Sequence, residues 1–408
     1  MAQAHRDQLV VEGHKNRRST RPRVAHFVRK DTQFRASFIQ NQVQAHVRYQ
    51  PVLLWRAQVS KPLDGGYGQF DGAPYPRLDL SQGQRWLDRA WFAGPGMLSP
   101  RQQRMILEFL REQRVALCHF HYGTDCGLYY PLLRKLKIPS VVSFYGYDCS
   151  SFPGRYFGYG AAFLQRRVFR DASAVFAMSP DMKKDLLNAG CPEEKVIVHY
   201  YGTDCRRFFV DRQFPEKEEV TLLMVASLEP QKGHEFLFRS LLGLKKDGIH
   251  NWKLRLVGAG RLEEDLKALA ARSGLSGQIA FLGALKYGGE ELIREYKQAD
   301  IFVHPSVTAG NGDKEGIPGT VVEAMAAGLP VISTYHAGIP YIIEQGRTGL
   351  LAGEWDIECL RAHLSRLIAA PGLRAQLGTA GQAYALKHLD LQEKEKELEA
   401  IYSQICAG

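Results

Sequence analysis

Residues 304–334 read HPSVTAGNGDKEGIPGTVVEAMAAGLPVIST, which is the most informative stretch of the chain. A tight turn at 316–320 leads directly into the helix-forming run 321–327, which Gly328 stops. A turn that opens onto a helix presents free backbone N–H groups and the positive end of the helix dipole. Both features favour an anion, so the stretch predicts a phosphate site.

Two carboxylates flank this turn. Glu323, near the start of the helix, can accept hydrogen bonds from two adjacent hydroxyls, which a ribose offers. Glu315 precedes the turn and is expected on the far side of the phosphates, where a sugar would lie. Together with the turn, these carboxylates predict a site for a nucleotide sugar.

The segment EGIPGTVVEAMAAGLPVI, residues 315–332, closely resembles the donor-site signature of the GT-B glycosyltransferases of family 4. That signature has Glu-x7-Glu, then Ala-Met-Ala/Ser and a Gly-x-Pro-Val strand. The resemblance covers about residues 23–405 and implies the GT-B fold, an α/β fold of two Rossmann-like doubly wound parallel-sheet domains that face a cleft. It also implies a retaining hexosyltransferase that uses no metal and no other cofactor.

The resemblance assigns roles at this site residue by residue. Glu315 is the catalytic candidate, placed at the sugar hydroxyls and at the positive charge that develops on the ring. No second carboxylate suits a double displacement, so a front-face, ion-pair-like route is favoured. Glu323 binds the ribose, and the turn binds the rest of the donor through Gly316, Ile317, Pro318, Gly319 and Thr320.

Further donor contacts are predicted after three strands. Lys232 follows a predicted strand and supplies a point charge for a diphosphate. The stretch resembles the family's Gly-Arg-Leu-x-x-x-Lys-Gly element, but Ser227 replaces the arginine, so only the lysine role carries over and Ser227 offers a hydroxyl. Gly260 and Leu285 resemble residues that line the nucleotide pocket, with ordinary strand-end turns as the alternative. Leu262 and Glu263 break the dinucleotide pattern after Gly260.

The first half offers a second set of candidates. Residues 142–148 resemble the family's Thr-Phe-His-Gly-x-Asp, with Tyr145 in place of a histidine that approaches the donor sugar and with Asp148 in the acidic position. A tyrosine can hydrogen-bond a sugar hydroxyl but is a poor base near pH 7. His119 and His121 alternate along a strand, so they share one face and are predicted to reach the cleft as acceptor or phosphate contacts. The alternative is a pair of satisfied histidines at a strand end.

A last pair of acceptor or phosphate candidates, Arg35 and Ser37, opens the helix after the first strand. Because the candidate polar groups are split between the halves of the chain, closure of the cleft is predicted to complete the site.

Short β-branched runs alternate with longer amphipathic ones, which predicts parallel sheets covered by helices. Four parts are expected: a basic flexible tail (1–22), an acceptor domain (23–205), a nucleotide-sugar domain (206–391) and a helix that crosses back to the first domain (392–408). The predicted strands are 24–28, 52–55, 115–121, 140–145, 174–178, 196–200, 220–226, 253–257, 279–282, 301–304 and 331–333.

The charge of the 408-residue chain is concentrated in its first half. Residues 1–200 hold 29 Lys and Arg against 16 Asp and Glu, whereas residues 201–408 hold 24 against 27. Such an asymmetry points to an anionic partner: a membrane, a phosphorylated acceptor or a nucleic acid. The arginines and aromatic residues at 155–170 suit a membrane interface, with an ordinary sheet-packed helix as the alternative.

These observations predict a cytoplasmic enzyme, peripheral on the inner face of a membrane, with a nucleotide sugar and a glycan or lipid-linked acceptor as partners and no nucleic acid. No signal peptide and no membrane span is expected. The seven cysteines form no CxxC pair and suggest neither a disulfide framework nor a zinc site. Two rival functions remain: a GT-B sugar-phosphate synthase or nucleotide-sugar epimerase, and a non-catalytic polyanion binder with steep salt dependence.

Overall fold

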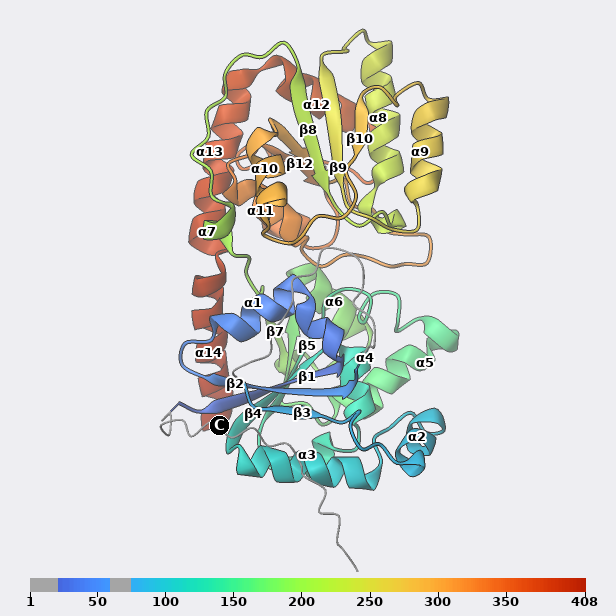
Figure 1. The fold of residues 1–408 in the computed structure, drawn as a ribbon, viewed down its shortest axis with the longest axis vertical. Helices are drawn as coiled ribbons and strands as arrows, with labels where there is room; N and C mark the ends of the chain where they lie inside the picture. Colours follow the sequence, from blue (N-terminus) through green and yellow to red (C-terminus); the bar gives the residue numbers. More distant parts are fainter. Residues whose placement is uncertain (1–20, 59–74) are drawn as a thin grey trace, which may run out of the picture.

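The computed structural model describes residues 21–58 and 75–408. They form two wholly parallel sheets, one in each half of the chain, each packed with helices (Figure 1). The predicted α/β class with two doubly wound parallel sheets is confirmed. Most of the predicted basic tail lies outside the described residues.

The first sheet has seven strands in the order β3-β2-β1-β4-β5-β6-β7. The strand order reverses between β1 and β4, and ligands of such sheets bind beyond the carboxyl ends of the strands at this switch point. The strands are β1 (Arg23–Lys30), β2 (Gln50–Ala57), β3 (Arg77–Asp79), β4 (Val115–His121), β5 (Ser140–Ser143), β6 (Ala174–Ala177) and β7 (Val196–Val198).

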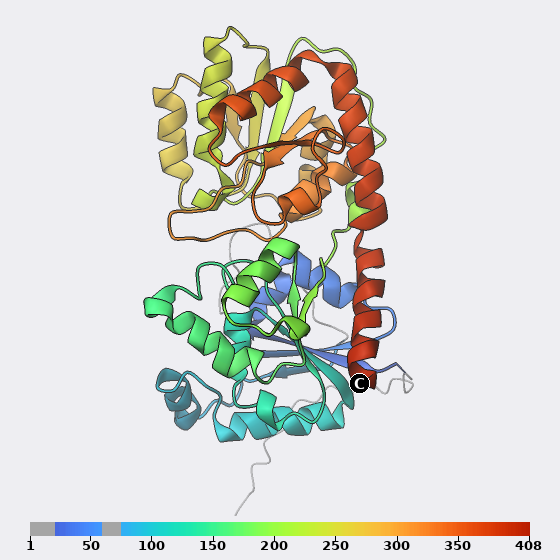
Figure 2. The ribbon, with the colours of Figure 1, turned by 180° about the vertical axis from the view of Figure 1, so that it is seen from behind.

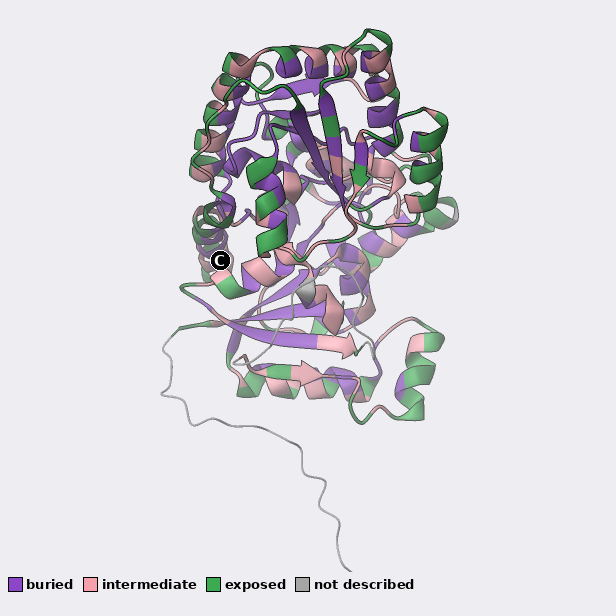
Figure 3. Ribbon diagram, turned by 45° about the horizontal axis from the view of Figure 1, so that its top comes forward, coloured by how far each residue is buried: buried purple, intermediate pink, exposed green. Residues whose placement is uncertain are grey.

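The second sheet has six strands in the order β10-β9-β8-β11-β12-β13, so its switch point lies between β8 and β11. Its strands are almost entirely buried, whereas the outer helix faces are exposed (Figure 3). The strands are β8 (Val220–Val225), β9 (Trp252–Val257), β10 (Ile279–Phe281), β11 (Ile301–Val303), β12 (Val331–Thr334) and β13 (Leu350–Ala352).

Fourteen α-helices connect and cover the strands in the described residues. They are α1 (Ser37–Ala45), α2 (Trp86–Ala93), α3 (Pro100–Glu112), α4 (Gly123–Cys126), α5 (Arg155–Leu164), α6 (Pro180–Asn188), α7 (Cys205–Phe208), α8 (His234–Lys246), α9 (Glu263–Arg272), α10 (Glu290–Gln298), α11 (Gly319–Ala326), α12 (Ile357–Ala369), α13 (Pro371–His388) and α14 (Leu391–Ala407). Within residues 21–58 and 75–408, none of them is long and apolar enough to span a bilayer.

Eleven predicted strands are present with shifts at their ends, but the two edge strands β3 and β13 were missed. Both are only three residues long, and β3 reads Arg-Leu-Asp, which carries no apolar run for a sequence pattern to detect.

The last helix, α14, runs down the side of the first half of the chain (Figures 1 and 2). The Glu399 carboxylate on α14 accepts three backbone N–H groups, those of Val47, Arg48 and Tyr49, at 2.8–3.0 Å. The chain thus connects the two sheets twice, once after β7 and once at the start of α14. These two connections lie side by side where Thr203 pairs with Asp390.

Candidate functional site

The switch point of the second sheet brings Lys232 and Glu315 together. Lys232 ends a 3₁₀ turn after β8, and Glu315 follows β11, the neighbouring strand. The Lys232 Nζ and Glu315 Oε1 atoms form an ion pair. Gly233, at φ 73°, allows this approach, because a Cβ there would lie 1.9 Å from the Pro305 carbonyl oxygen.

Glu315 is held by several neighbours, and its side chain is 8% exposed. Ser306 Oγ donates to its Oε2 at 2.9 Å, and His304 Nε2 lies 3.3 Å from the same atom. The Glu315 N–H donates to His336 Nε2 at 3.2 Å, so His336 carries its proton on Nδ1, which donates to Glu354 at 2.6 Å.

Sequence reasoning missed these supporting residues: His304, Ser306, His336 and Glu354. The available signal was their position, since His304 directly follows β11 and His336 lies two residues after β12, at the carboxyl edge of the sheet where ligands bind.

The turn before α11 is compact. Gly316, Ile317 and Pro318 are buried, and the helix begins at Gly319. The Thr320 Oγ1 lies 3.4 Å from His304 Nδ1, which ties the first turn of α11 to the Glu315 environment. The N-terminus of α11 therefore opens beside the Lys232–Glu315 pair.

Glu323 lies in the second turn of α11, because the helix begins at Gly319, before the predicted run 321–327. Its side chain is nearly buried, and Tyr296 Oη donates to its Oε2 at 2.8 Å. Burial raises the pKa of Glu323 to about 7, although the Tyr296 hydrogen bond opposes this shift.

This raised pKa predicts a stability effect. The pKa of Glu323 in the folded protein lies above its ordinary value of 4.5. The stability that the neutral carboxyl contributes is therefore fully present below pH 4.5 and is lost as pH rises through about 7. At pH 8 we expect Glu323→Gln to raise the free energy of unfolding by up to roughly 3 kcal/mol, and therefore to melt at a higher temperature than wild type. At pH 4.5 we expect no gain in stability. Calorimetric melting at both values checks this, and equal melting at pH 8 would contradict it.

The other predicted donor contacts lie on neighbouring loops. Ser227 is exposed in the loop after β8, and Leu285 is partly buried against the core beneath α11. At Gly260 a Cβ would lie 2.5 Å from the Leu228 carbonyl oxygen. The glycine is therefore needed to pack the loop after β9 onto the loop after β8.

The predicted exposure of His119 and His121 to a cleft is wrong, because both are fully buried. His119 Nδ1 lies 2.5 Å from the Tyr402 hydroxyl of α14, and its Nε2 lies 2.7 Å from Ser143 Oγ. His121 Nδ1 lies 2.6 Å from the hydroxyl of Tyr145, which is itself half-buried.

Asp148 also differs from its predicted role as an acceptor or phosphate contact. It is 1% exposed, and its carboxylate accepts the backbone N–H groups of Gly123, Tyr145 and Gly146. Asp148 thus joins the loop after β4 to the loop after β5. Because its oxygens accept these backbone hydrogen bonds, its role in this structure is structural.

The two halves of the chain meet around the site. Lys314, next to Glu315, pairs with Asp185 at 2.7 Å, and its N–H donates to Ser150 Oγ at 3.3 Å. These residues line a small pocket with Gly146. On α1, Asn41 Nδ2 donates to the Tyr287 hydroxyl at 2.9 Å.

The candidates Arg35 and Ser37 precede or open α1, the helix that carries Asn41. Ser37 is partly exposed, and the Arg35 side chain lies outside the described parts of the structure.

Comparisons with known proteins agree with this fold. The description "Glycosyl transferases group 1" matches residues 206–384, and "Glycosyl transferase 4-like domain" matches residues 32–202. Among solved structures, HepE of Anabaena in complex with UDP has a TM-score of 0.74 at 17% identity, over 94% of this chain and 100% of that chain. Sucrose-phosphate synthase of Thermosynechococcus elongatus has a TM-score of 0.72 at 17% identity, over 95% and 100%.

Two curated relatives share more sequence. The amylovoran biosynthesis glycosyltransferase AmsK of Erwinia amylovora is 34% identical over 62% of this chain and 61% of its own length. The putative colanic acid biosynthesis glycosyltransferase WcaL of Salmonella typhimurium is 33% identical over 49% of this chain and 48% of its own. The chain thus covers less than two thirds of these relatives. With both halves matched by glycosyltransferase descriptions, the chain belongs to the GT-B glycosyltransferases with a 4-like first domain and a group 1 second domain.

Proposed function

We propose that the protein is a retaining glycosyltransferase that moves a hexose from a nucleotide sugar, UDP-linked, to a hydroxyl of a lipid-linked or surface-polysaccharide acceptor. The contact between Lys232 and Glu315 at the start of α11 carries this proposal, since it joins a cation and a carboxylate where a helix opens. The names of AmsK and WcaL support the polysaccharide setting, and the UDP complex of HepE supports the donor class.

In this proposal the chain's own groups perform the chemistry. Lys232 and the N–H groups at the start of α11 neutralise the departing diphosphate, the work that Mg²⁺ does elsewhere. Glu315 binds the sugar hydroxyls and stabilises the positive charge that develops on the ring. Glu323 binds the ribose. No residue here is assigned to hold a metal.

A panel of UDP-, GDP- and ADP-sugars tests the proposal. We expect one nucleotide class to raise the melting temperature and to be slowly hydrolysed without acceptor. A panel that produces neither stabilisation nor hydrolysis would contradict it.

The peripheral-membrane part of the proposal rests on an arginine–aromatic face formed by α2, α5 and the residues that follow α5. These helices lie on the same side of the molecule in Figures 1 and 2, and Arg167 NH1 donates to the Gly96 carbonyl after α2 at 3.2 Å. The exposed residues of this face are Arg85, Trp86, Arg89, Trp91, Arg155, Phe157, Tyr159 and Arg166.

We expect the protein to float with anionic vesicles at low salt and not at high salt, at about 1 kcal/mol per surface Lys or Arg. Trp86→Ser combined with Phe157→Ser should weaken flotation, whereas Tyr341→Ser, an exposed aromatic of the second half, should not. Absence of binding to anionic vesicles at low salt would contradict the membrane assignment and favour a soluble acceptor.

The split of the site between the two halves predicts a role for Tyr145 in the closed state. Tyr145→Phe should leave nucleotide affinity intact and reduce transfer, because Tyr145 is proposed to meet only the sugar. Donor binding should also lower the radius of gyration by rotation about the linker 203–219 and the last helix, which meet where Thr203 pairs with Asp390. Scattering with and without nucleotide measures this. An unchanged radius together with full activity of Tyr145→Phe would contradict both statements.

A further inference from the structure

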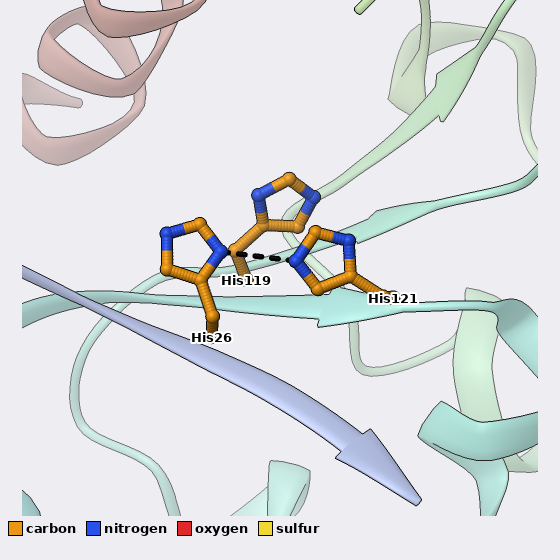
Figure 4. Close-up of side chains that lie close together, drawn as sticks. All are labelled: His26, His119 and His121. Carbon is orange, nitrogen blue, oxygen red and sulfur yellow. Dashed lines mark hydrogen bonds between the residues drawn. The ribbon is translucent and has the colours of Figure 1, made fainter. Parts of the chain in front are cut away.

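A buried row of histidines connects α14 to Tyr145. His46, His26 and His121, which we call the histidine chain, are joined by ring nitrogens: His46 Nε2 to His26 Nε2 at 2.9 Å and His26 Nδ1 to His121 Nε2 at 3.0 Å. Figure 4 shows the second contact. At one end His121 Nδ1 reaches the Tyr145 hydroxyl, and at the other His46 Nδ1 lies 2.5 Å from Glu395 Oε1.

The alternative to a hydrogen-bonded chain is a metal ion bound by the histidines. Nitrogens of His26, His119 and His121 lie within 4.8 Å of one another. Both His119 nitrogens, however, already have partners in Tyr402 and Ser143, and the hydrogen bond drawn in Figure 4 joins only His26 and His121. Hydrogen bonding accounts for every nitrogen of the cluster without an ion.

His46 is the charged member of the chain. Burial lowers the pKa of His46, but Glu395 and Glu399 outweigh this effect and raise it to about 9. His46 also caps the carboxyl end of α1, where the helix dipole favours a cation. The titratable groups that face it are His26 of β1, His119 and His121 of β4, and Glu395, Glu399 and Tyr402 of α14.

A charged His46 fixes the direction of every hydrogen bond along the chain. An imidazolium donates from both nitrogens, so His26 Nε2 must accept. Burial lowers the pKa of His26 and His121 well below the usual range, so both are neutral. His26 then donates from Nδ1 to His121 Nε2, and His121 donates from Nδ1 to the Tyr145 oxygen.

We propose that the histidine chain holds Tyr145 as a hydrogen-bond donor toward the bound ligand. The Tyr145 hydroxyl has a second side-chain hydrogen bond, with Ser143, which favours the tyrosinate and therefore donates to the Tyr145 oxygen. With that oxygen accepting from His121 and from Ser143, the Tyr145 proton donates to a sugar oxygen or to another acceptor of the donor substrate. A neutral His46 would allow the reverse direction, in which Tyr145 donates into the chain and loses that proton for the ligand. His46, His26, His121 and Glu395 are therefore positioning residues. This inference rests on the proposed function of Tyr145.

Nitrogen NMR of histidine-labelled protein tests the chain without any activity assay. With signals assigned through single His→Gln variants, we expect His46 as an imidazolium and both His26 and His121 protonated on Nδ1. A neutral His46, or Nε2 protonation of either neighbour, would overturn the proposal. So would a stoichiometric transition metal in elemental analysis, because an ion would take the lone pairs of His26 Nδ1 and His121 Nε2.

Glu395→Gln tests the consequence for transfer. Glu395 is chosen because Glu399 also holds three backbone N–H groups and its replacement would disturb the fold. Without the Glu395 charge the His46 pKa falls, and transfer should decline with rising pH about two units earlier than in wild type. Any decline caused by Lys232, whose pKa burial lowers to about 8, is common to both enzymes.

If the proposal holds, the effect of Glu395→Gln on transfer depends on the Tyr145 hydroxyl. At pH 8, Glu395→Gln should lower transfer ~10-fold in the wild-type background and less than ~2-fold in Tyr145→Phe. Glu393→Gln, a more exposed carboxylate of the same helix, is the matched control and should keep the wild-type pH profile. An unchanged pH profile of transfer in Glu395→Gln would contradict the proposed role of the histidine chain. So would an equal loss of transfer on adding Glu395→Gln to the Tyr145→Phe variant. A wild type with no transfer would instead contradict the proposed function.

Discussion

Lys232→Ala should lower turnover by ~100-fold or more, which is the range for losing one preorganised charge at a developing anion. Lys232 is positioned by the 3₁₀ turn after β8 and by Gly233, and its partner Glu315 lies on the adjacent strand's loop. In the proposed mechanism, Lys232 exchanges the Glu315 carboxylate for phosphate oxygens when the donor's diphosphate binds.

The pH dependence follows from the same group. Burial lowers the pKa of Lys232 to about 8, so turnover should fall as pH rises through that value. Lys267→Ala removes an exposed lysine of α9 and is the matched control. Near wild-type turnover in Lys232→Ala would show that Ser227, which stands where the family has an arginine, marks a wider loss of this phosphate site.

Glu323→Ala should weaken nucleotide binding by ~1–3 kcal/mol, as expected for a lost charged hydrogen-bond acceptor. In the structure the Glu323 carboxylate is buried beside the start of α11 and bonds to Tyr296. The carboxylate form is the better acceptor for ribose hydroxyls. Because its pKa is raised to about 7, wild-type affinity should strengthen as pH rises through that value and the variant's should not.

Calorimetric titration with UDP and GDP measures this effect. Glu264→Ala, which removes an exposed carboxylate of α9, is the control. An affinity for the free nucleotide that is unchanged in Glu323→Ala would remove this residue from the site.

The second half was largely predictable because its information is local. The run from Glu315 to Thr334 contains the turn, the helix and the next strand, so one segment fixes the elements and their order. Lys232 was found in the same way, from a glycine and a lysine at a strand end. Its contact with Glu315 follows from the adjacency of β8 and β11, which a doubly wound sheet implies.

The first half was less predictable because its polar groups act through contacts between distant segments. The alternation of His119 and His121 correctly placed both on one face, and their rings stack at 4.4 Å. The sequence does not reveal that α14 covers this face with Tyr402, more than 280 positions away. Nor does a local pattern reveal that His46, an ordinary residue at a helix end, pairs with Glu395.

A crystal structure of the protein with its nucleotide-sugar donor tests the proposed donor site. We expect the ribose hydroxyls on Glu323, the diphosphate between Lys232 and the N-terminus of α11, and the hexose beside Glu315. A donor bound elsewhere, or a diphosphate that contacts neither Lys232 nor the first turn of α11, would contradict it.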